Sequence, residues 1–343
     1  MKEKMRLASV SRACRQWARL ALQLATEFKA NYRTITVGRF VHLLHLMRGE
    51  ETEKTKLRKI DCRQVEFDDN DDDEGLWSAI GALCPQLEDL TLYLNHLRLQ
   101  NKEHLLTACK KLQNLRKLTI DGRDSFYCHS ISCLRELSLK VLDVDVDGQA
   151  NLIEAWKLFS NQSPLSRSIE ELRLINVFFN DGQLFLDRMA ESCSNMVKLK
   201  LSSCPGLSIN FSTYFTSAHF PNLRELFLFH TIVKGFSGCH LPMLERLGIG
   251  RRNRPTTDDT VRSILLGCPS LVWLDACDFK PSLDFLTRWA EIGRNCQRAW
   301  EAPLVMNSGS FCGWPAEIQE YVKNLGLAWK DGGCKIAFDC PLD

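Results

Sequence analysis

The sequence has almost no excess of charge of either sign. Its 44 lysines and arginines stand against 42 aspartates and glutamates, which leaves a formal net charge of +2. This balance gives no electrostatic reason to expect nucleic acid or an anionic membrane as a partner. No apolar run approaches the roughly 18 residues that a membrane span needs. The first residues, MKEKMRLASVSRACRQW, are charged and do not resemble a secretory signal.

Motifs that usually carry catalysis or bind a metal are also missing. There is no Gly-x-Ser-x-Gly or phosphate-loop pattern. The eight histidines are scattered, and Cys128, His129 and Cys133 have no evident fourth ligand for zinc. The acidic run EFDDNDDDE, residues 66–74, lacks the glycine and glutamate of a calcium-binding EF-hand loop, which favours a solvated loop. We therefore predict no enzyme, no cofactor and no metal site.

Cysteine, in contrast, is abundant, with 15 residues. An even set of cysteines at regular spacing is typical of short disulfide-rich secreted chains. Here the number is odd, no Cys-x-x-Cys pair occurs, and most cysteines lie in apolar stretches such as Leu83-Cys84-Pro85 and Gly267-Cys268-Pro269. We predict that they are reduced, buried residues of an intracellular protein rather than members of disulfides.

One apolar pattern, Leu-x-x-Leu-x-Leu, recurs along most of the chain. The clear copies are Leu87-Leu90-Leu92, Leu115-Leu118-Ile120, Leu134-Leu137-Leu139, Ile169-Leu172-Leu174, Met196-Leu199-Leu201, Leu223-Leu226-Leu228 and Leu244-Leu247-Ile249, with weaker copies at Leu57-Ile60-Cys62 and Leu271-Leu274-Ala276. Their first positions are 30, 28, 19, 35, 27, 27, 21 and 27 residues apart. Most spacings lie in or near the leucine-rich-repeat period of about 20–29 residues, and the spacing of 35 indicates an insertion.

The pattern predicts a short strand in each repeat, because apolar residues two apart point to the same side of a strand. Several copies follow a helical pattern, such as Leu76, Ile80 and Leu83. We therefore predict an α/β fold, a leucine-rich-repeat solenoid shaped like a horseshoe, with a parallel sheet on the concave face and helices on the convex face. The solenoid is assigned to residues 51–290.

The remaining 53 residues, 291–343, depart from the repeat and are interpreted as a C-terminal cap. Residues 283–298 are expected to form a helix that leads into this cap. A second helix is expected from Pro315 to Leu325, because proline favours the first helical turn. A short strand is expected from Lys335 to Asp339.

The repeats resemble those of the F-box/leucine-rich-repeat proteins, in their cysteine-containing form. The segments that carry the resemblance are LCPQLEDL at residues 83–90 and GCPSLVWL at residues 267–274, with a looser copy at residues 192–199. The resemblance covers roughly residues 57–290. It implies a protein that binds other proteins, since many interaction proteins share this repeat.

The N-terminal segment, residues 1–50, resembles the latter part of an F-box. The residues that match are Leu7, Val10, Cys14 and Trp17, and the last three share one helical face. The resemblance implies that these residues dock a Skp-type adaptor of a cullin-based ubiquitin ligase. The Leu-Pro-x-Glu stretch and first helix of an F-box do not precede them, so we expect a truncated or degenerate F-box. The alternative is an amphipathic cap on the first repeat.

If the F-box works, the chain is the substrate-recognition subunit of an SCF-type ligase in the cytoplasm, the nucleus or both. If it does not, the chain is an interaction scaffold or inhibitor with no ligase link. In either case we expect a target protein on the outward strand positions. The outward residues chosen as target-binding are Tyr93, Arg173, Phe227, Phe229, Arg246 and Trp273.

The aromatic members of this set suggest a pocket. Phe227, Phe229 and Trp273 flank Gly248 and Gly250, and aromatic side chains are enriched in binding hot spots. The alternative is that the C-terminal tail folds over these rings. In the repeat at residues 134–139, the pattern places Glu136, Ser138 and Lys140 outward.

Overall fold

The computed structural model describes only part of the 343 residues. The described residues are 25–29, 35–48, 55–63, 65–66, 73–93, 108, 111–122, 131–151, 154–160, 163–250, 257–276, 282–288, 304–307, 317 and 335–338. The chain divides into two compact units, unit 1 with Met1–Glu154 and Ser163–Leu165, and unit 2 with Ala155–Gln162 and Ser166–Asp343. Leu7, Val10, Cys14 and Trp17 lie outside the described residues.

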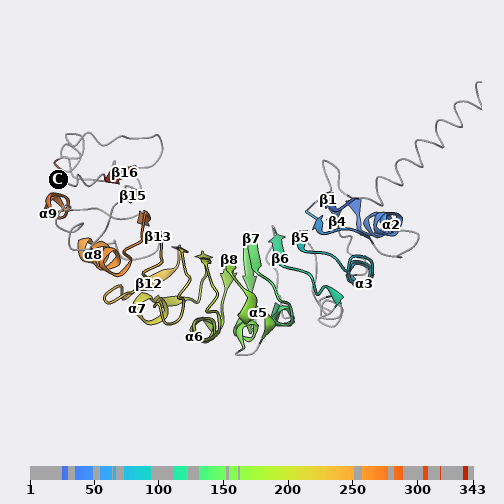
Figure 1. Cartoon of the computed structure of the whole chain (residues 1–343), viewed down its shortest axis with the longest axis horizontal. Coiled ribbons are helices and arrows are strands. Elements are labelled where there is room, and N and C mark those ends of the chain that lie inside the picture. Colours follow the sequence, from blue (N-terminus) through green and yellow to red (C-terminus); the bar gives the residue numbers. More distant parts are fainter. Residues whose placement is uncertain are drawn as a thin grey trace, which may run out of the picture. The chain divides into compact units, whose positions relative to one another are not determined.

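Unit 1 is built on a parallel sheet in which each strand pairs with the strand of the next repeat (Figure 1). Its strands, in order, are β1 (Glu27–Lys29), β3 (Lys59–Asp61), β5 (Asp89–Tyr93), β6 (Lys117–Gly122) and β7 (Val141–Asn151). The other elements are β2 (Ile35–Thr36) paired with β4 (Val65–Glu66), helices α2 (Val37–Met47) and α3 (Asp73–Leu83), and the 3-10 helix η1 (Ile131–Glu136). Thr36 begins α2, because its hydroxyl accepts a hydrogen bond from the Arg39 N–H.

Unit 2 continues the same architecture. Its main sheet runs β8 (Glu171–Phe178), β9 (Lys198–Ser202), β11 (Glu225–Phe229), β13 (Arg246–Gly250), β14 (Trp273–Ala276) and β15 (Leu304–Asn307), all parallel, and then β16 (Lys335–Phe338), antiparallel. Its helices are η2 (Ala155–Phe159), α6 (Gly182–Ser192), α7 (Phe211–Tyr214), α8 (Asp258–Gly267) and α9 (Leu283–Thr287), and α5 (Pro164–Ser168) lies at the boundary of the units. A separate pair is formed by β10 (Ser208–Asn210) and β12 (Ile232–Lys234).

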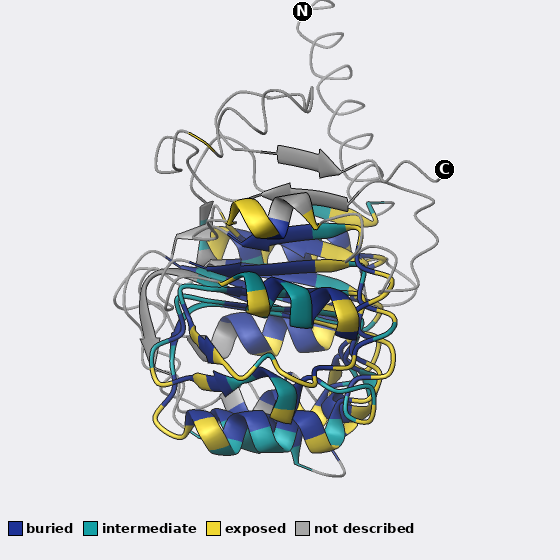
Figure 2. Cartoon of the chain, turned by 90° about the vertical axis from the view of Figure 1, so that its left-hand side faces the viewer, coloured by how far each residue is buried: buried dark blue, intermediate teal, exposed yellow. Residues whose placement is uncertain are grey.

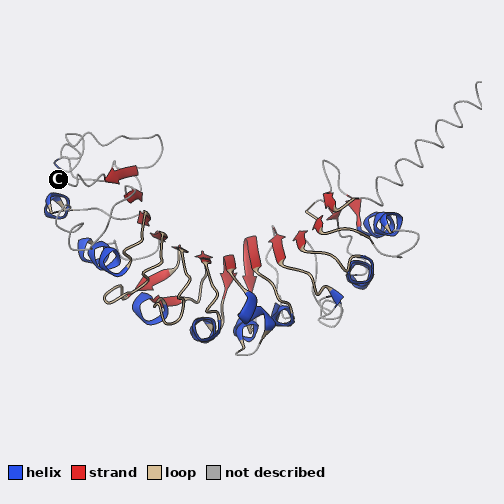
Figure 3. Ribbon diagram, in the orientation of Figure 1, coloured by secondary structure: helices blue, strands red, loops and turns tan. Residues whose placement is uncertain are grey.

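The apolar positions of the repeat form the core, as the pattern predicted. In unit 2 the register aligns two rows of side chains, which are Leu172, Leu199, Leu226, Leu247 and Leu274, and then Leu174, Leu201, Leu228, Ile249 and Ala276. Every one of these residues is at most 2% exposed. Helices pack over them on one side of the sheet (Figure 3). In Figure 2 the strands are largely buried, while the helices carry both buried and exposed residues. The leucine-rich-repeat fold is therefore confirmed.

The predicted copy at residues 134–139 is wrong. Residues 131–136 form η1, and the strand begins only at Val141, whose N–H, with that of Lys140, donates to the Arg116 carbonyl oxygen. Leu142 pairs with Leu118, and Val144 pairs with Ile120.

The true copy of the pattern is therefore Leu139-Leu142-Val144. The first positions Leu115, Leu139 and Ile169 then stand 24 and 30 residues apart. The exceptional spacings of 19 and 35 disappear, and so does the expected insertion. Val141, Asp143 and Asp145 replace Glu136, Ser138 and Lys140 as the outward residues.

Polar contacts join successive repeats at the turns. Asparagines that precede the first apolar position donate through the side-chain amide to a carbonyl oxygen of the previous repeat, as Asn114 does to Pro85 at 2.9 Å, Asn195 to Arg167 at 2.7 Å and Asn222 to Ser194 at 3.3 Å. Backbone N–H groups of the previous repeat donate to the carbonyl oxygens at the ends of helices. The Thr55 N–H donates to Leu83 O at 2.7 Å, and the Leu241 N–H donates to Gly267 O at 2.9 Å.

The six cysteines whose side chains are described are buried and free of disulfides, and their burial was predicted. They are Cys62, Cys84, Cys193, Cys204, Cys239 and Cys268.

At the C-terminus, the predicted strand is confirmed as β16. Of the helix expected at 283–298 the structure describes α9, and of the one expected at Pro315–Leu325 it describes Glu317 alone. None of the helices formed by the described residues is long and apolar enough to cross a membrane.

Gly267 is required by the close approach of two repeats. A β-carbon at this position would lie 2.1 Å from Cys239 O and 2.5 Å from Cys239 Sγ. We predict that Gly267→Ala lowers the free energy of unfolding by about 2–3 kcal/mol, because backbone must move to relieve the clash. Denaturant unfolding measures this. Gly38→Ala is the control, since a β-carbon there meets nothing within 4 Å, and it should change stability by at most about 1 kcal/mol, in the stabilising direction. A Gly267→Ala variant as stable as the natural chain would contradict the packing.

Candidate functional site

In each unit the parallel sheet has one face that the helices do not cover, called here the open face (Figure 3). Outward strand residues form it. In unit 2 the register sorts them into three rows. The first row holds Glu171, Lys198, Glu225, Arg246 and Trp273; the middle row holds Arg173, Lys200, Phe227, Gly248 and Asp275; the last row holds Ile175, Ser202, Phe229 and Gly250.

The first row is a chain of alternating charges. Lys198 Nζ lies 2.8 Å from Glu225 Oε2, and Arg246 Nη1 lies 3.8 Å from Glu225 Oε1. Beyond Glu225, the guanidinium carbon of Arg246 lies 5.2 Å from the centroid of the Trp273 ring, a cation–π contact. Each partly exposed pair contributes little stability by itself, but together they fix the direction of Arg246 and hold it against an aromatic face.

Three rings form an aromatic cluster, defined as Phe227, Phe229 and Trp273. The centroids of Phe227 and Phe229 are 6.0 Å apart, and those of Phe227 and Trp273 are 5.7 Å apart with an edge-on geometry. All three side chains are half-buried. A half-buried aromatic cluster beside a cation is the composition typical of interface hot spots.

The expected pocket at Gly248 is filled by these rings. A β-carbon at Gly248 would meet Phe229 Cζ at 2.5 Å and Phe227 Cδ1 at 2.8 Å. The missing side chain lets the two phenylalanine rings settle over the neighbouring strand, which removes the hollow that the sequence suggested. The site at Gly248 is therefore a packed aromatic surface, and glycine is needed to form it.

Most of the predicted target-binding residues come together in unit 2. Phe227 contacts Phe229 and Trp273, Trp273 contacts Arg246, and Arg173 lies in the middle row on β8. Tyr93 ends β5 in unit 1, and its side chain is outside the described part. Two residues that line this surface, Lys200 and Glu225, were predicted to point outward but were not selected. Aligning the repeats on their leucines would have placed Lys200 beside Arg173.

The C-terminal strands extend the sheet beside the aromatic cluster. Val305 of β15 pairs with Trp273 in register, and Asn307 pairs with Asp275. β16 then pairs with β15. These described strands of the tail thus add to the edge of the sheet, so they do not run across the open face.

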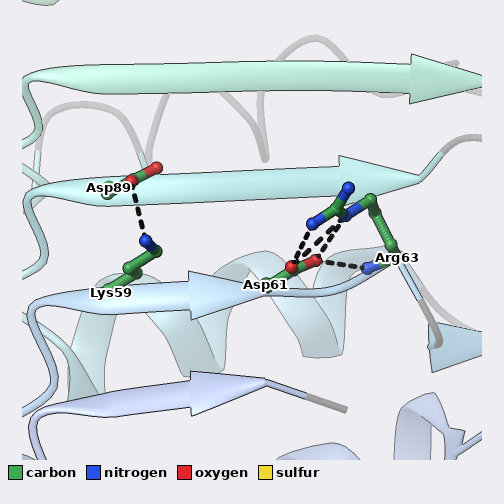
Figure 4. Close-up of polar contacts among 4 residues, drawn as sticks. All are labelled: Lys59, Asp61, Arg63 and Asp89. Atoms are coloured by element: carbon green, nitrogen blue, oxygen red, sulfur yellow. Dashed lines mark hydrogen bonds and ion pairs between the residues drawn. The ribbon is translucent and has the colours of Figure 1, made fainter. Parts of the chain in front are cut away.

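The open face of unit 1 is mostly polar where the structure describes it (Figure 4). Lys59 Nζ lies 3.8 Å from Asp89 Oδ2. Asp61, at 6% exposure, accepts hydrogen bonds from the Arg63 guanidinium, the shortest at 2.7 Å, and from the Arg63 N–H at 3.1 Å. Burial opposes ionisation of Asp61, but these hydrogen bonds and the charge of Arg63 outweigh it and lower the pKa of the carboxyl group.

The buried thiols show no sign of a nucleophile. Burial raises the pKa of Cys84 to about 11 and that of Cys204 to about 12, so both thiols are protonated at neutral pH. The pKa of Cys239 is lowered by a hydrogen bond with Cys268, yet Cys239 is only 5% exposed. Among the described residues, no group of three or more His, Cys, Asp or Glu side chains is placed to hold a metal ion.

Comparisons with known proteins find distant structural similarity only. No family model and no curated protein matches the sequence. Among solved structures, a leucine-rich-repeat protein of Leptospira interrogans is 16% identical with a TM-score of 0.43, covering 87% of this chain and 63% of that one. An internalin of Listeria monocytogenes is 13% identical with a TM-score of 0.37, covering 77% and 84%. A Bacteroides fragilis protein is 15% identical with a TM-score of 0.34, covering 60% and 64%.

The chain thus spans less than two thirds of the Leptospira and Bacteroides proteins. At these scores the similarity carries no inference about function. The assignment of the fold rests on the aligned strands and buried rows of this chain, and the functional reasoning rests on its open face.

The ion pair of Asp61 and Arg63 gives a testable pH dependence. Because the folded-state pKa of Asp61 lies below the usual 3.8, its contribution is present above that pH and is lost as the pH falls through the lowered value. We predict that Asp61→Asn lowers the free energy of unfolding by about 1–2 kcal/mol near neutral pH. Urea unfolding near pH 7 and near pH 2.5 should show this difference shrinking in acid. A difference that is equal at both pH values would show that the charge of Asp61 is not involved.

Proposed function

We propose that this chain binds a partner protein on the open face of unit 2. The observation that carries the proposal is a row of contacts on a sheet face that the helices leave uncovered. Phe227 contacts Phe229 and Trp273, and Trp273 contacts Arg246. Aromatic rings bury a large apolar area with little loss of conformational entropy, and arginine adds directional hydrogen bonds.

The geometry favours recognition over catalysis. Side chains on the open face are positioned by strands whose inner residues are fully buried, so the surface is preorganised. Its charged groups are engaged in ion pairs such as Lys198–Glu225 and Arg246–Glu225. Such a surface offers shape, apolar area and fixed charges to another protein.

A finer proposal follows from the resemblance to F-box/leucine-rich-repeat proteins. In it, Leu7, Val10, Cys14 and Trp17 dock a Skp-type adaptor, and the open face of unit 2 presents a target to a cullin-based ubiquitin ligase in the cytoplasm or nucleus. Its support is the helical spacing of Val10, Cys14 and Trp17 together with the cysteine-containing repeats. The alternative is a scaffold or inhibitor that uses the same face with no ligase link.

Partner binding should depend on the aromatic cluster. We predict that Phe227→Ala combined with Trp273→Ala removes partners that co-purify with the tagged full chain, while unfolding free energy changes by about 1–2 kcal/mol per site, because both side chains are half-buried. Quantitative mass spectrometry of affinity-purified chain measures the loss. Leu266→Ala is the control, since Leu266 is 52% exposed on α8, on the helical side. Partners retained by the double variant but lost from Leu266→Ala would overturn the assignment.

Adaptor binding tests the finer proposal separately. We predict that the purified full chain captures a Skp-type adaptor, and that Trp17→Ala reduces capture at least about tenfold by removing an apolar anchor. Phe227→Ala should leave adaptor capture unchanged, because Phe227 is not among the residues that match an F-box. Failure to capture the adaptor, with any missing upstream part of the F-box restored, would leave the scaffold alternative.

A further inference from the structure

Two arginine–glutamate pairs join the repeats of β11 and β13, and they differ in geometry. Arg224, which precedes β11, donates a hydrogen bond to Glu245 Oε1 at 2.7 Å. Arg246 begins β13, and its Nη1 lies 3.8 Å from Glu225 Oε1, which is too far for a hydrogen bond. The other oxygen of Glu225 lies 2.8 Å from Lys198 Nζ. The carboxylate of Glu225 is thus shared between two cations and lies closer to Lys198.

The Arg246 side chain is held in place without using its hydrogen-bonding capacity. Its guanidinium carbon lies 5.2 Å from the centroid of the Trp273 ring. Apart from this stacking and the ion pair with Glu225, the guanidinium makes no polar contact with the residues that the structure describes, although it carries five N–H donors. The side chain is 47% exposed, so a ligand reaches the guanidinium from solvent.

A carboxylate is the group that fits this arginine. It accepts two parallel hydrogen bonds from a guanidinium, a geometry that a lysine cannot offer. The exchange costs the free protein little, because Arg246 gives up only the 3.8 Å contact, and Lys198 keeps Glu225 paired. The ring of Trp273 shields one side of the guanidinium from water, which strengthens its interaction with an anion.

Trp273 links this cation to the aromatic cluster. Its ring centroid lies 5.7 Å from that of Phe227, so the cation and the apolar surface are direct neighbours. Side chains two positions apart in an extended segment lie about 6.6 Å apart on one side. Those three or four positions apart on a helix lie about 5–6 Å apart. One short segment of a partner therefore spans both parts of the site.

We propose that Arg246 selects the partner protein, by binding an acidic side chain that lies two to four residues from a large apolar side chain covering Phe227 and Trp273. This rests on the proposed function, since it names the chemistry of the partner at the same open face. Two cations that share the one carboxylate of Glu225 supply the charge complementarity, and the stacking on Trp273 supplies the orientation.

A peptide selection tests the proposal without knowledge of the natural partner. The probe is a phage library of random dodecapeptides, fused through their C-termini to the coat protein so that none offers a terminal carboxylate. It is selected on the immobilised full chain. Relative to the unselected library, we expect enrichment of Asp or Glu two to four residues from Phe, Trp, Leu or Met. Synthetic copies with amidated C-termini are then titrated by isothermal titration calorimetry.

A double-mutant cycle decides the role of Arg246. Arg246→Gln should weaken binding of an enriched peptide at least about tenfold, and the peptide with its acid replaced by the matching amide should bind both forms within about twofold. Arg224→Gln is the matched control, because it makes the same change in an exposed arginine that already has its hydrogen bond. It should alter neither affinity by more than about twofold. Thermal unfolding verifies that each variant folds.

The outcomes separate this proposal from the general one. Enriched peptides without an acidic residue, or equal losses for Arg246→Gln and Arg224→Gln, overturn the role of Arg246. So does an amide peptide with a free C-terminus that binds as tightly as the acidic one, because the terminal carboxylate would then be the ligand. If the peptides still lose binding on Trp273→Ala, the protein-binding face stands. Binding that depends on neither Arg246 nor Trp273, or a selection that enriches nothing, counts against both proposals.

Discussion

The strands of the repeats each carry one apolar side that a single repeat cannot bury. Parallel stacking of the strands in constant register buries this side. Leu172, Leu199 and Leu226 lie one above another because each strand hydrogen-bonds to the next without a shift. A shift by one residue would turn every inner leucine to the open face. Register is therefore the constraint on which the core of each unit depends, and the turn asparagines and buried helix-end carbonyls reinforce it between repeats.

The same register builds the surface. Because inner residues are aligned, outer residues are aligned too, and the open face becomes a grid in which neighbours across strands are fixed by the sequence of each repeat. This produces the ion-pair chain through Glu225, the alignment of Lys200 with Arg173, and the meeting of Phe227 with Trp273. Glycine at position 248 completes the grid by leaving room for the rings on β11.

The sequence was sufficient to predict the fold because apolar residues spaced three and then two positions apart recur along the chain with few interruptions. It failed at residues 134–139, where Leu139 belongs to two overlapping copies of the pattern. Leucine spacing cannot choose between them. The choice is made by backbone hydrogen bonds to Arg116 and by the start of β7 at Val141. The outward residues of unit 2 could be predicted because they alternate with the inner leucines along each strand. The sequence did not predict that rings fill the expected pocket, since the ring positions over Gly248 depend on packing across strands.

If the open face of unit 2 holds a partner protein through its aromatic cluster, binding buries the rings of that cluster. Hydroxyl-radical footprinting with mass spectrometry, on the full chain with and without its co-purified partner, tests this most directly, because it reads side-chain accessibility at single residues. We predict that oxidation of Phe227, Phe229 and Trp273 falls on binding, while Met243, which is 43% exposed in the turn before β13, is unchanged. Unchanged oxidation of the three rings, with protection confined to residues on the helical side such as Leu266, would contradict the account.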